Sequence, residues 1–373
     1  MESHSLGIDE LSVPAAPGAT GWPEFVAAVD VRNRVEAHAY GTGELAQSAE
    51  ELLPGYLTPE HSPRRMFVAR VAGAIVGRAA YETQADPSSE FAWFTVEVLP
   101  EWRGRGIGSA LLDVLETLAA AEHRSSRVIY AVSPPGPGER LVPPTGFGSV
   151  PLANPEVRFL LHRGYRLEQV ERGSRLQLPV DPAVLARQLR EAAARAGEDY
   201  ALLSWTGRTP ERWLEDMALL YTRMSTDAPT AGLEEPEDVW SVERLRSEQD
   251  AYAAGPGRTL VTAVLHRPSG RLAGFTELSV PGDTSRAVTQ EDTLVLREHR
   301  GHRLGMLMKL ANLQSLAREH PRHPAVTTFN AEENRYMLDV NEALGFVPMG
   351  YEGAWRKVSA AADSAGSSAT SGS

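Results

Sequence analysis

A strand, a cationic glycine-containing turn and a helix follow one another twice in this sequence, and the repetition limits the folds open to the chain. Residues 95–108 read TVEVLPEWRGRGIG and residues 292–305 read DTLVLREHRGHRLG. Arg103 and Arg300 occupy the same place in the two stretches, and each stretch closes on a glycine. This self-similarity predicts that the chain contains two copies of one domain.

The turn in each copy has the features of an anion-binding site. The first N–H groups of a helix are unpaired and carry the positive end of the helix dipole. Glycines let an anion approach these groups, and arginines add charge. In the first copy the expected phosphate contacts are Arg103, Gly104, Arg105, Gly106, Ile107 and Gly108. In the second copy they are Arg300, Gly301, His302, Arg303, Leu304 and Gly305. Neither turn has the sequence of a P-loop or of a dinucleotide-binding loop.

The composition of the chain limits the classes of molecule that it is expected to bind. A length of 373 residues suits two domains, each large enough to bury a core. The net charge of −12 argues against a nucleic-acid partner and modestly favours a cationic amine substrate. The sequence has no cysteine, which excludes disulfides, thiolate metal sites and a cysteine nucleophile. Acyl transfer in such a chain is either direct or uses another nucleophile.

Targeting features are not evident in the sequence. Residues 1–20 are acidic and rich in proline and alanine, unlike a secretory signal peptide. Apolar runs fall short of the ~18 residues that a membrane-spanning helix needs. We therefore expect a cytoplasmic protein without a membrane partner.

The first turn resembles the acetyl-CoA pyrophosphate loop of the GNAT superfamily of N-acetyltransferases. Val98–Gly108 contains the Arg-x-x-Gly-x-Gly pattern of that loop. The second loop is similar but has Arg303 where the first signature glycine would be. Asn334 precedes Gly345-Phe346 by eleven residues, which resembles the closing helix and strand of the family. The resemblance covers about residues 22–358 and is to the tandem type found in actinobacteria.

This resemblance implies an α+β (α/β) fold of two tandem GNAT-like domains, each with a mixed, mostly antiparallel sheet flanked by helices. We expect Arg175–Val180 to complete the first sheet. The predicted division is a disordered arm (1–21), an N-terminal domain (22–180), a connecting helix (181–197), a C-terminal domain (198–358) and a disordered tail (359–373).

Periodicity and turn residues predict the individual elements. Helices are expected at 23–38, 44–53, 107–123, 181–196, 210–224, 240–249 and 334–344. Strands are expected at 65–71, 74–82, 91–99, 127–132, 175–180, 200–205, 259–265, 272–280, 324–330 and 346–357. Residues 133–155 contain so many prolines and glycines that they read as a long loop, and Thr209 is expected to cap the helix that follows it.

The resemblance also implies a catalytic apparatus. In the family a backbone N–H on the central strand stabilises the oxyanion, and this role carries over to Val98 and Val295. Relatives often place an acid on that strand four residues earlier, where the first copy has Phe94 and the second has Glu291. Glu291 and Asp292 are therefore the candidate general bases, unless they are solvated residues at a strand start. We discount Glu97, because strand alternation sends it to the other side of the sheet.

The remaining roles are less defined by the sequence. Asn341 occupies the usual position of the family's tyrosine acid, so Tyr336, or else Tyr351, is the substitute. Asn330 and Asn334 are expected to contact the pantetheine arm, the alternative being turn or cap residues. His299 and His302 have no third ligand nearby, and no metal site is predicted.

These observations predict an acetyl-CoA-dependent N-acetyltransferase that acts on a small-molecule amine by direct attack in the C-terminal copy, with no metal. In one alternative neither copy catalyses, and the protein senses acyl-CoA or serves as a scaffold. In another the N-terminal copy is the active one. The identity of the amine and the oligomeric state are left open.

Overall fold

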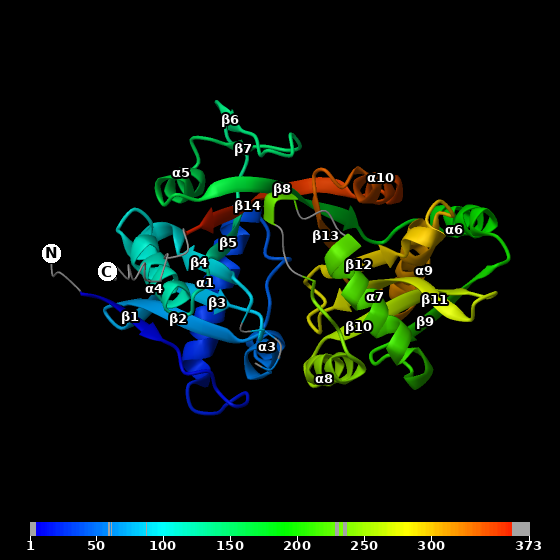
Figure 1. The fold of residues 1–373 in the computed structure, drawn as a ribbon, viewed down its shortest axis with the longest axis horizontal. Helices are drawn as coiled ribbons and strands as arrows, with labels where there is room; N and C mark the ends of the chain where they lie inside the picture. The colour runs from blue at the N-terminus through cyan, green and yellow to red at the C-terminus, as the bar shows by residue number, and fades with distance from the viewer. Residues whose placement is uncertain are drawn as a thin grey trace, which may run out of the picture.

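One continuous sheet of twelve strands runs through the described chain (Figure 1). The computed structural model describes residues 5–58, 60, 62–86, 88–227, 231–233 and 237–359. In the N-terminal half the strands of this sheet are β1 (Leu6–Glu10), β2 (Arg64–Val71), β3 (Ala74–Glu82), β4 (Phe91–Val98), β5 (Ser126–Val132) and β8 (Arg166–Gln177). Those of the C-terminal half are β9 (Tyr200–Thr206), β10 (Arg258–His266), β11 (Arg271–Val280), β12 (Val288–Val295), β13 (Ala325–Ala331) and β14 (Val347–Val358).

The helices follow a similar order in the two halves, with one more short helix described in the N-terminal half. The N-terminal half has α1 (Trp22–Tyr40), α2 (Ala49–Leu52), α3 (Pro54–Leu57), α4 (Ile107–Ala121) and α5 (Pro155–His162). After α6 (Pro182–Ala196), the C-terminal half has α7 (Leu214–Asp227), α8 (Val242–Ala253), α9 (Leu304–Glu319) and α10 (Arg335–Leu344). The two-copy prediction therefore agrees with the order of the elements.

The two halves exchange their last strands. The sheet order is β1-β2-β3-β4-β5-β14-β8-β13-β12-β11-β10-β9, so β14 lies between β5 and β8, and β8 lies between β14 and β13. Both exchanged strands are antiparallel to their neighbours and cross the middle of the molecule in Figure 1. The prediction that Arg175–Val180 completes the first sheet is therefore wrong, because this strand spans Arg166–Gln177 and pairs only with strands of the other half.

Apolar residues alternate along the strands, so each half has a core on both faces of the sheet. In the C-terminal half, α7 and α8 pack on the face that presents Val261, Phe275 and Leu294. On the opposite face, α6 and α9 pack against Val288 and Val295. The predicted connector, residues 181–197, is thus part of the C-terminal core, and its helix is followed by Gly197 at the C-cap.

Several local predictions need correction. The predicted disordered arm includes Leu6–Glu10, which form β1 by antiparallel pairing with β2. The predicted helix at 44–53 shrinks to α2, which begins after the capping box of Ser48. The loop 133–155 contains the short ladder β6 (Arg140–Leu141) with β7 (Val150–Pro151). Thr209 does not cap a helix, since its side chain instead accepts a hydrogen bond from Gln249. Residues 360–373, in the predicted tail, lie outside the described residues.

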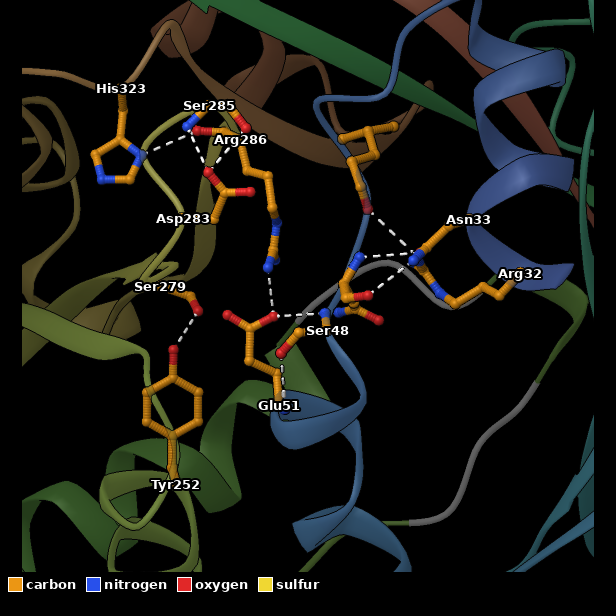
Figure 2. Close-up of polar contacts among 12 residues, drawn as sticks. Arg32, Asn33, Ser48, Glu51, Tyr252, Ser279, Asp283, Ser285, Arg286 and His323 are labelled. Carbon is orange, nitrogen blue, oxygen red and sulfur yellow. Dashed lines mark hydrogen bonds and ion pairs between the residues drawn. The ribbon is translucent and has the colours of Figure 1, made fainter. Parts of the chain in front are cut away.

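Polar contacts also join the halves beside the sheet. Arg286, which precedes β12, forms an ion pair of 2.5 Å with Glu51 of α2, and both side chains are largely buried (Figure 2). The Glu51 carboxylate also accepts the backbone N–H of Ser48. The backbone N–H of Ala287 donates to the carbonyl of Glu44, whose carboxylate pairs with Arg175 of β8. The start of β12 is thus held by the N-terminal half.

Candidate active site

The first loop presents bare backbone at the start of α4. Gly104 and Gly106 have φ values of 73° and 81°, in the left-handed region that favours glycine. An added Cβ at either position would have no neighbouring atom within 4 Å, so the space in front of the backbone is open. Nε of Arg103 donates to the carbonyl of Val98 at 3.1 Å, which fixes the arginine beside the turn. This arrangement fits an anion such as a pyrophosphate.

The second loop has the same frame and a different surface. Nε of Arg300 donates to the carbonyl of Val295, also at 3.1 Å. Arg303 precedes α9 with φ 55°, so a side chain stands where the first loop has a glycine. Asp227, at the end of α7, forms ion pairs with Arg300 at 2.7 Å and with Arg297 at 3.0 Å. Part of the cationic charge of this loop is therefore already neutralised.

Beside each loop the central strand parts from its parallel neighbour. The pairing of β4 with β5 ends at Phe94 and Ile129, and that of β12 with β13 ends at Thr289 and Thr327. The backbone N–H of Leu296 donates to the carbonyl of Ala273 on β11. Because N–H groups alternate in direction along a strand, the N–H of Val295 points into the β12–β13 opening.

Val98 lies in the same position beside the β4–β5 opening. The N–H of Leu99 donates to Val76 on β3, so the N–H of Val98 points the other way. Both predicted oxyanion donors therefore face an opening next to a predicted anion-binding loop.

A β-bulge in β12 collects three carboxylates on one face. Thr276 pairs with Thr293, and Leu278 pairs with Gln290, so Glu291 and Asp292 together oppose the single residue Glu277. The Thr276 hydroxyl hydrogen-bonds with Thr293 at 2.7 Å and accepts from Gln290 at 3.0 Å, which places Gln290 and Thr293 on the α9 face. The two residues between them are thereby directed to the α7 face.

Without this bulge, alternation would send adjacent carboxylates to opposite faces. Glu277 lies on the α7 face, where it is hydrogen-bonded to the Tyr221 hydroxyl. Tyr221 stacks on Trp240 with ring centroids 4.7 Å apart. Sequence reasoning had missed Glu277 and Tyr221, because only the bulge brings them beside the predicted bases.

The environment raises the pKa values of these three carboxyl groups. Burial and the neighbouring Asp292 raise the pKa of Glu291 to about 7. Burial also raises the pKa of Asp292, and it raises that of Glu277 to about 8. Glu291 nevertheless keeps an exposed surface, so it is both crowded by protein atoms and open to solvent. A carboxylate of this kind can accept a proton near neutral pH.

The N-terminal half has different groups at the corresponding place. Phe94 is buried in the core, and Glu97 pairs with the buried Arg78. A cavity of about 450 Å³ lies beside β4, and residues of both halves line it, among them Trp93, Thr95 and Tyr130 of the N-terminal half and Asp238 of the C-terminal half. Sequence reasoning did not single out Glu36 of α1, where burial raises the pKa to about 7.

The structure brings together only some of the residues that were predicted to act as the general acid or to contact the pantetheine arm. Tyr336 is 56% exposed on α10, which packs on α9, so it lies on the other side of the sheet from Glu291. The side-chain oxygen of Asn334 caps α10 by accepting the N–H of Met337. The side-chain oxygen of Asn330 accepts a hydrogen bond from Asn341 at 2.8 Å.

Two kinds of feature are absent from the described residues. Within those ranges, no helix is long and apolar enough to cross a membrane. Likewise, no cluster of three or more histidine, aspartate or glutamate side chains suited to a metal ion occurs in the part of the chain that the structure describes.

Comparison with known proteins identifies the fold. Residues 35–138 match the acetyltransferase (GNAT) family model. No curated protein shows significant similarity to the sequence. A tandem GNAT protein from the clavulanic acid biosynthesis pathway is 23% identical, with a TM-score of 0.71, over 95% of this chain and 98% of that one. A GCN5-related N-acetyltransferase from Sphaerobacter thermophilus is 13% identical, with a TM-score of 0.62, over 95% of each chain. The chain thus has the fold of a tandem GNAT protein, and residues 35–138 in its N-terminal half match the acetyltransferase (GNAT) family model.

Proposed function

We propose that this protein transfers an acetyl group from acetyl-CoA to the amine of a small molecule, and that the reaction takes place in the C-terminal half. The observation that carries the proposal is the bulge in β12, which gathers Glu277, Glu291 and Asp292 on one face beside the β12–β13 opening. Acyl transfer to an amine requires a proton acceptor there, and Glu291 meets this need with its raised pKa and its exposure.

The other parts of the site support the same reaction. Arg300 and the start of α9 would hold the phosphates of the co-substrate, with Gly301, His302 and Arg303 around them. The N–H of Val295 would donate to the thioester oxygen as it gains charge. Glu291, or Asp292 beside it, would take a proton from the amine while the new C–N bond forms and the C–S bond breaks.

The acceptor is proposed to be an amine that arrives as a cation and loses one proton to solvent before it attacks. Three carboxylates lie close together on the α7 face, and a positive charge favours their ionised forms. The net charge of −12 would further draw a cation toward the protein. Tyr221 and Trp240 add an aromatic wall next to Glu277. A small amine with an apolar portion suits this surface.

A second candidate places acetyl-CoA in the N-terminal half. The bare Gly104 and Gly106 and the cavity beside β4 favour binding there. In the proposed function this half binds acetyl-CoA without turning it over, since Phe94 stands where the C-terminal half has Glu291. Catalysis in the N-terminal half is the competing hypothesis, and Glu36 would then be its base.

Calorimetric titration with acetyl-CoA tests where the co-substrate binds. Arg103→Ala and Arg300→Ala should each remove one of two sites. Because the chain has no cysteine, any thiol released during turnover belongs to coenzyme A. With a panel of small amines, we expect Glu291→Gln to reduce thiol release by ~10²-fold or more, as expected for loss of a general base.

The matched control is Glu215→Gln, which alters an exposed glutamate of α7 in the same half. Its turnover should equal that of the wild-type protein. If Arg103→Ala abolished turnover while Arg300→Ala and Glu291→Gln left it intact, the assignment to the C-terminal half would be wrong.

A further inference from the structure

A buried lysine lies behind the proposed site. Only two of the 37 basic residues are lysines, Lys309 and Lys357. Lys309 is 2% exposed in the second turn of α9, and its ammonium donates to the side-chain oxygen of Asn341 at 2.8 Å. Burying an amine is costly unless polar groups replace its lost hydration, and here the side-chain oxygen of Asn341 accepts its hydrogen bond.

The contacts of Lys309 place it over the β12–β13 opening. Gly305 faces β12, since a Cβ added to it would lie 3.9 Å from Cγ2 of Thr293. Lys309 follows by four residues and therefore lies on the same face of α9. Its partner Asn341 donates in turn to Asn330 on β13. The amine thus lies on the α9 face of the sheet and is linked through Asn341 to Asn330, which is beyond the last β12–β13 pair at Thr327.

The opening has a different chemical group on each side. Glu277, Glu291 and Asp292 are on the α7 face, whereas Lys309 is on the face covered by α9 and α10. An acyl donor lying in the opening would meet the incoming amine from the α7 face. Its leaving group would then depart toward Lys309.

We propose that Lys309 is the general acid that protonates the thiolate of coenzyme A as it leaves. This inference rests on the proposed function of the C-terminal half. As the C–S bond breaks, its electron pair goes to sulfur, which takes a proton from Nζ of Lys309. The amine proton goes to Glu291 or Asp292, and solvent returns Lys309 and the carboxylate to their starting states.

The chemistry of lysine suits this role better than that of arginine. Burial lowers the pKa of Lys309 to about 7, so it can give up a proton at neutral pH. A guanidinium stays protonated under the same conditions. Asn341 orients the amine and cannot itself act as an acid. Tyr336 is not needed in this scheme.

The shortage of lysines makes a direct test possible. Protein labelled with ¹³C at the lysine Cε should give two signals in NMR spectra, and Lys357→Arg leaves only that of Lys309. Lys357 lies on β14 and pairs with Glu116 in the N-terminal half, so this variant leaves the proposed site intact. The Lys309 signal is then followed against pH with no ligand, with coenzyme A and with desulfo-coenzyme A, which lacks the sulfur.

We expect coenzyme A to raise the pKa of Lys309 and desulfo-coenzyme A to leave it unchanged, because a nearby thiolate favours the ammonium. Equal responses to the two ligands would overturn the inference. If calorimetry showed that no ligand binds to the C-terminal half, the proposed function itself would be wrong. Calorimetry does not use the lysine signal, so this failure can be distinguished from a failure of the inference about Lys309.

Kinetics provide a second measurement. Lys309→Met should lower thiol release by ~10²-fold or more. Lys309→Arg should restore little of the lost thiol release, because a guanidinium keeps its proton. Acetyl-CoA affinity should stay near that of the wild-type protein in both variants. Full turnover in a folded Lys309→Met protein would contradict the proposal.

Discussion

Replacing Glu277 by glutamine should stabilise the protein at high pH. Glu277 is 7% exposed, and its pKa rises from 4.5 to about 8 in the folded protein. Below pH 4.5 the carboxyl is protonated in both the folded and unfolded states. Between the two pKa values only the unfolded state loses the proton, so stability falls as pH rises and levels off above about pH 8.

The size of the effect follows from the two pKa values. Each pH unit between them corresponds to ~1.4 kcal/mol, which gives ~5 kcal/mol as an upper limit. Glutamine has no charge to desolvate, and its carbonyl can still accept the Tyr221 hydroxyl. We therefore expect Glu277→Gln to equal wild type within ~1 kcal/mol at pH 5 and to exceed it by ~3 kcal/mol or more at pH 9.

Urea denaturation at both pH values measures the difference. Glu215→Gln, at an exposed position, serves as the control and should change the free energy of unfolding by less than ~0.5 kcal/mol at either pH. The reasoning would be refuted if Glu277→Gln changed the free energy of unfolding by the same amount at pH 5 and at pH 9. That result would mean that Glu277 titrates alike in the folded and unfolded chain.

Two further substitutions test the interface and the first loop. Arg286→Ala should lower the free energy of unfolding by ~3 kcal/mol in urea denaturation, since it leaves the largely buried Glu51 without its cation; a loss below ~0.5 kcal/mol would show that the pair does not stabilise the interface. Gly106→Ala should cost ~1 kcal/mol of stability because φ is 81° there, and calorimetry should show weaker acetyl-CoA binding because a methyl group would cover the bare backbone. Unchanged affinity would mean that the anion lies elsewhere.

The local elements could be predicted because their signals are local. The turns after β4 and β12 combine glycines, arginines and an apolar-periodic helix, and α4 begins at Ile107, as predicted. β1 was missed because five residues with one acidic end look like a polar arm, and only pairing with β2 makes them a strand. The exchange of β8 and β14 has no local signal, since either half could in principle pair with its own last strand.

The candidate site was predictable in part for the same reason. Glu291 and Asp292 were proposed as candidates from their place on the central strand, but alternation alone predicts that only one of them faces the acceptor side. The bulge opposite Glu277 depends on pairing with β11, which the sequence of β12 does not reveal. Lys309 looks like the solvent-facing residue of an amphipathic helix. The signal that could have revealed it is that α9 is apolar on almost all sides, as a helix covered by α6 and α10 should be.

The exchanged strands and the interface together explain why the proposed catalytic half needs its partner. β13 forms one wall of the β12–β13 opening, and its other neighbour is β8 from the N-terminal half. β12 begins one residue after Ala287, whose N–H donates to Glu44, and two residues after Arg286, which pairs with Glu51. The bulge follows only three residues later. Both edges of the opening are therefore fixed by the N-terminal half, and a C-terminal half made alone would lose the contacts that set the distance between Glu291 and β13. On this argument the first copy contributes to the chemistry through position, whether or not its own loop binds acetyl-CoA.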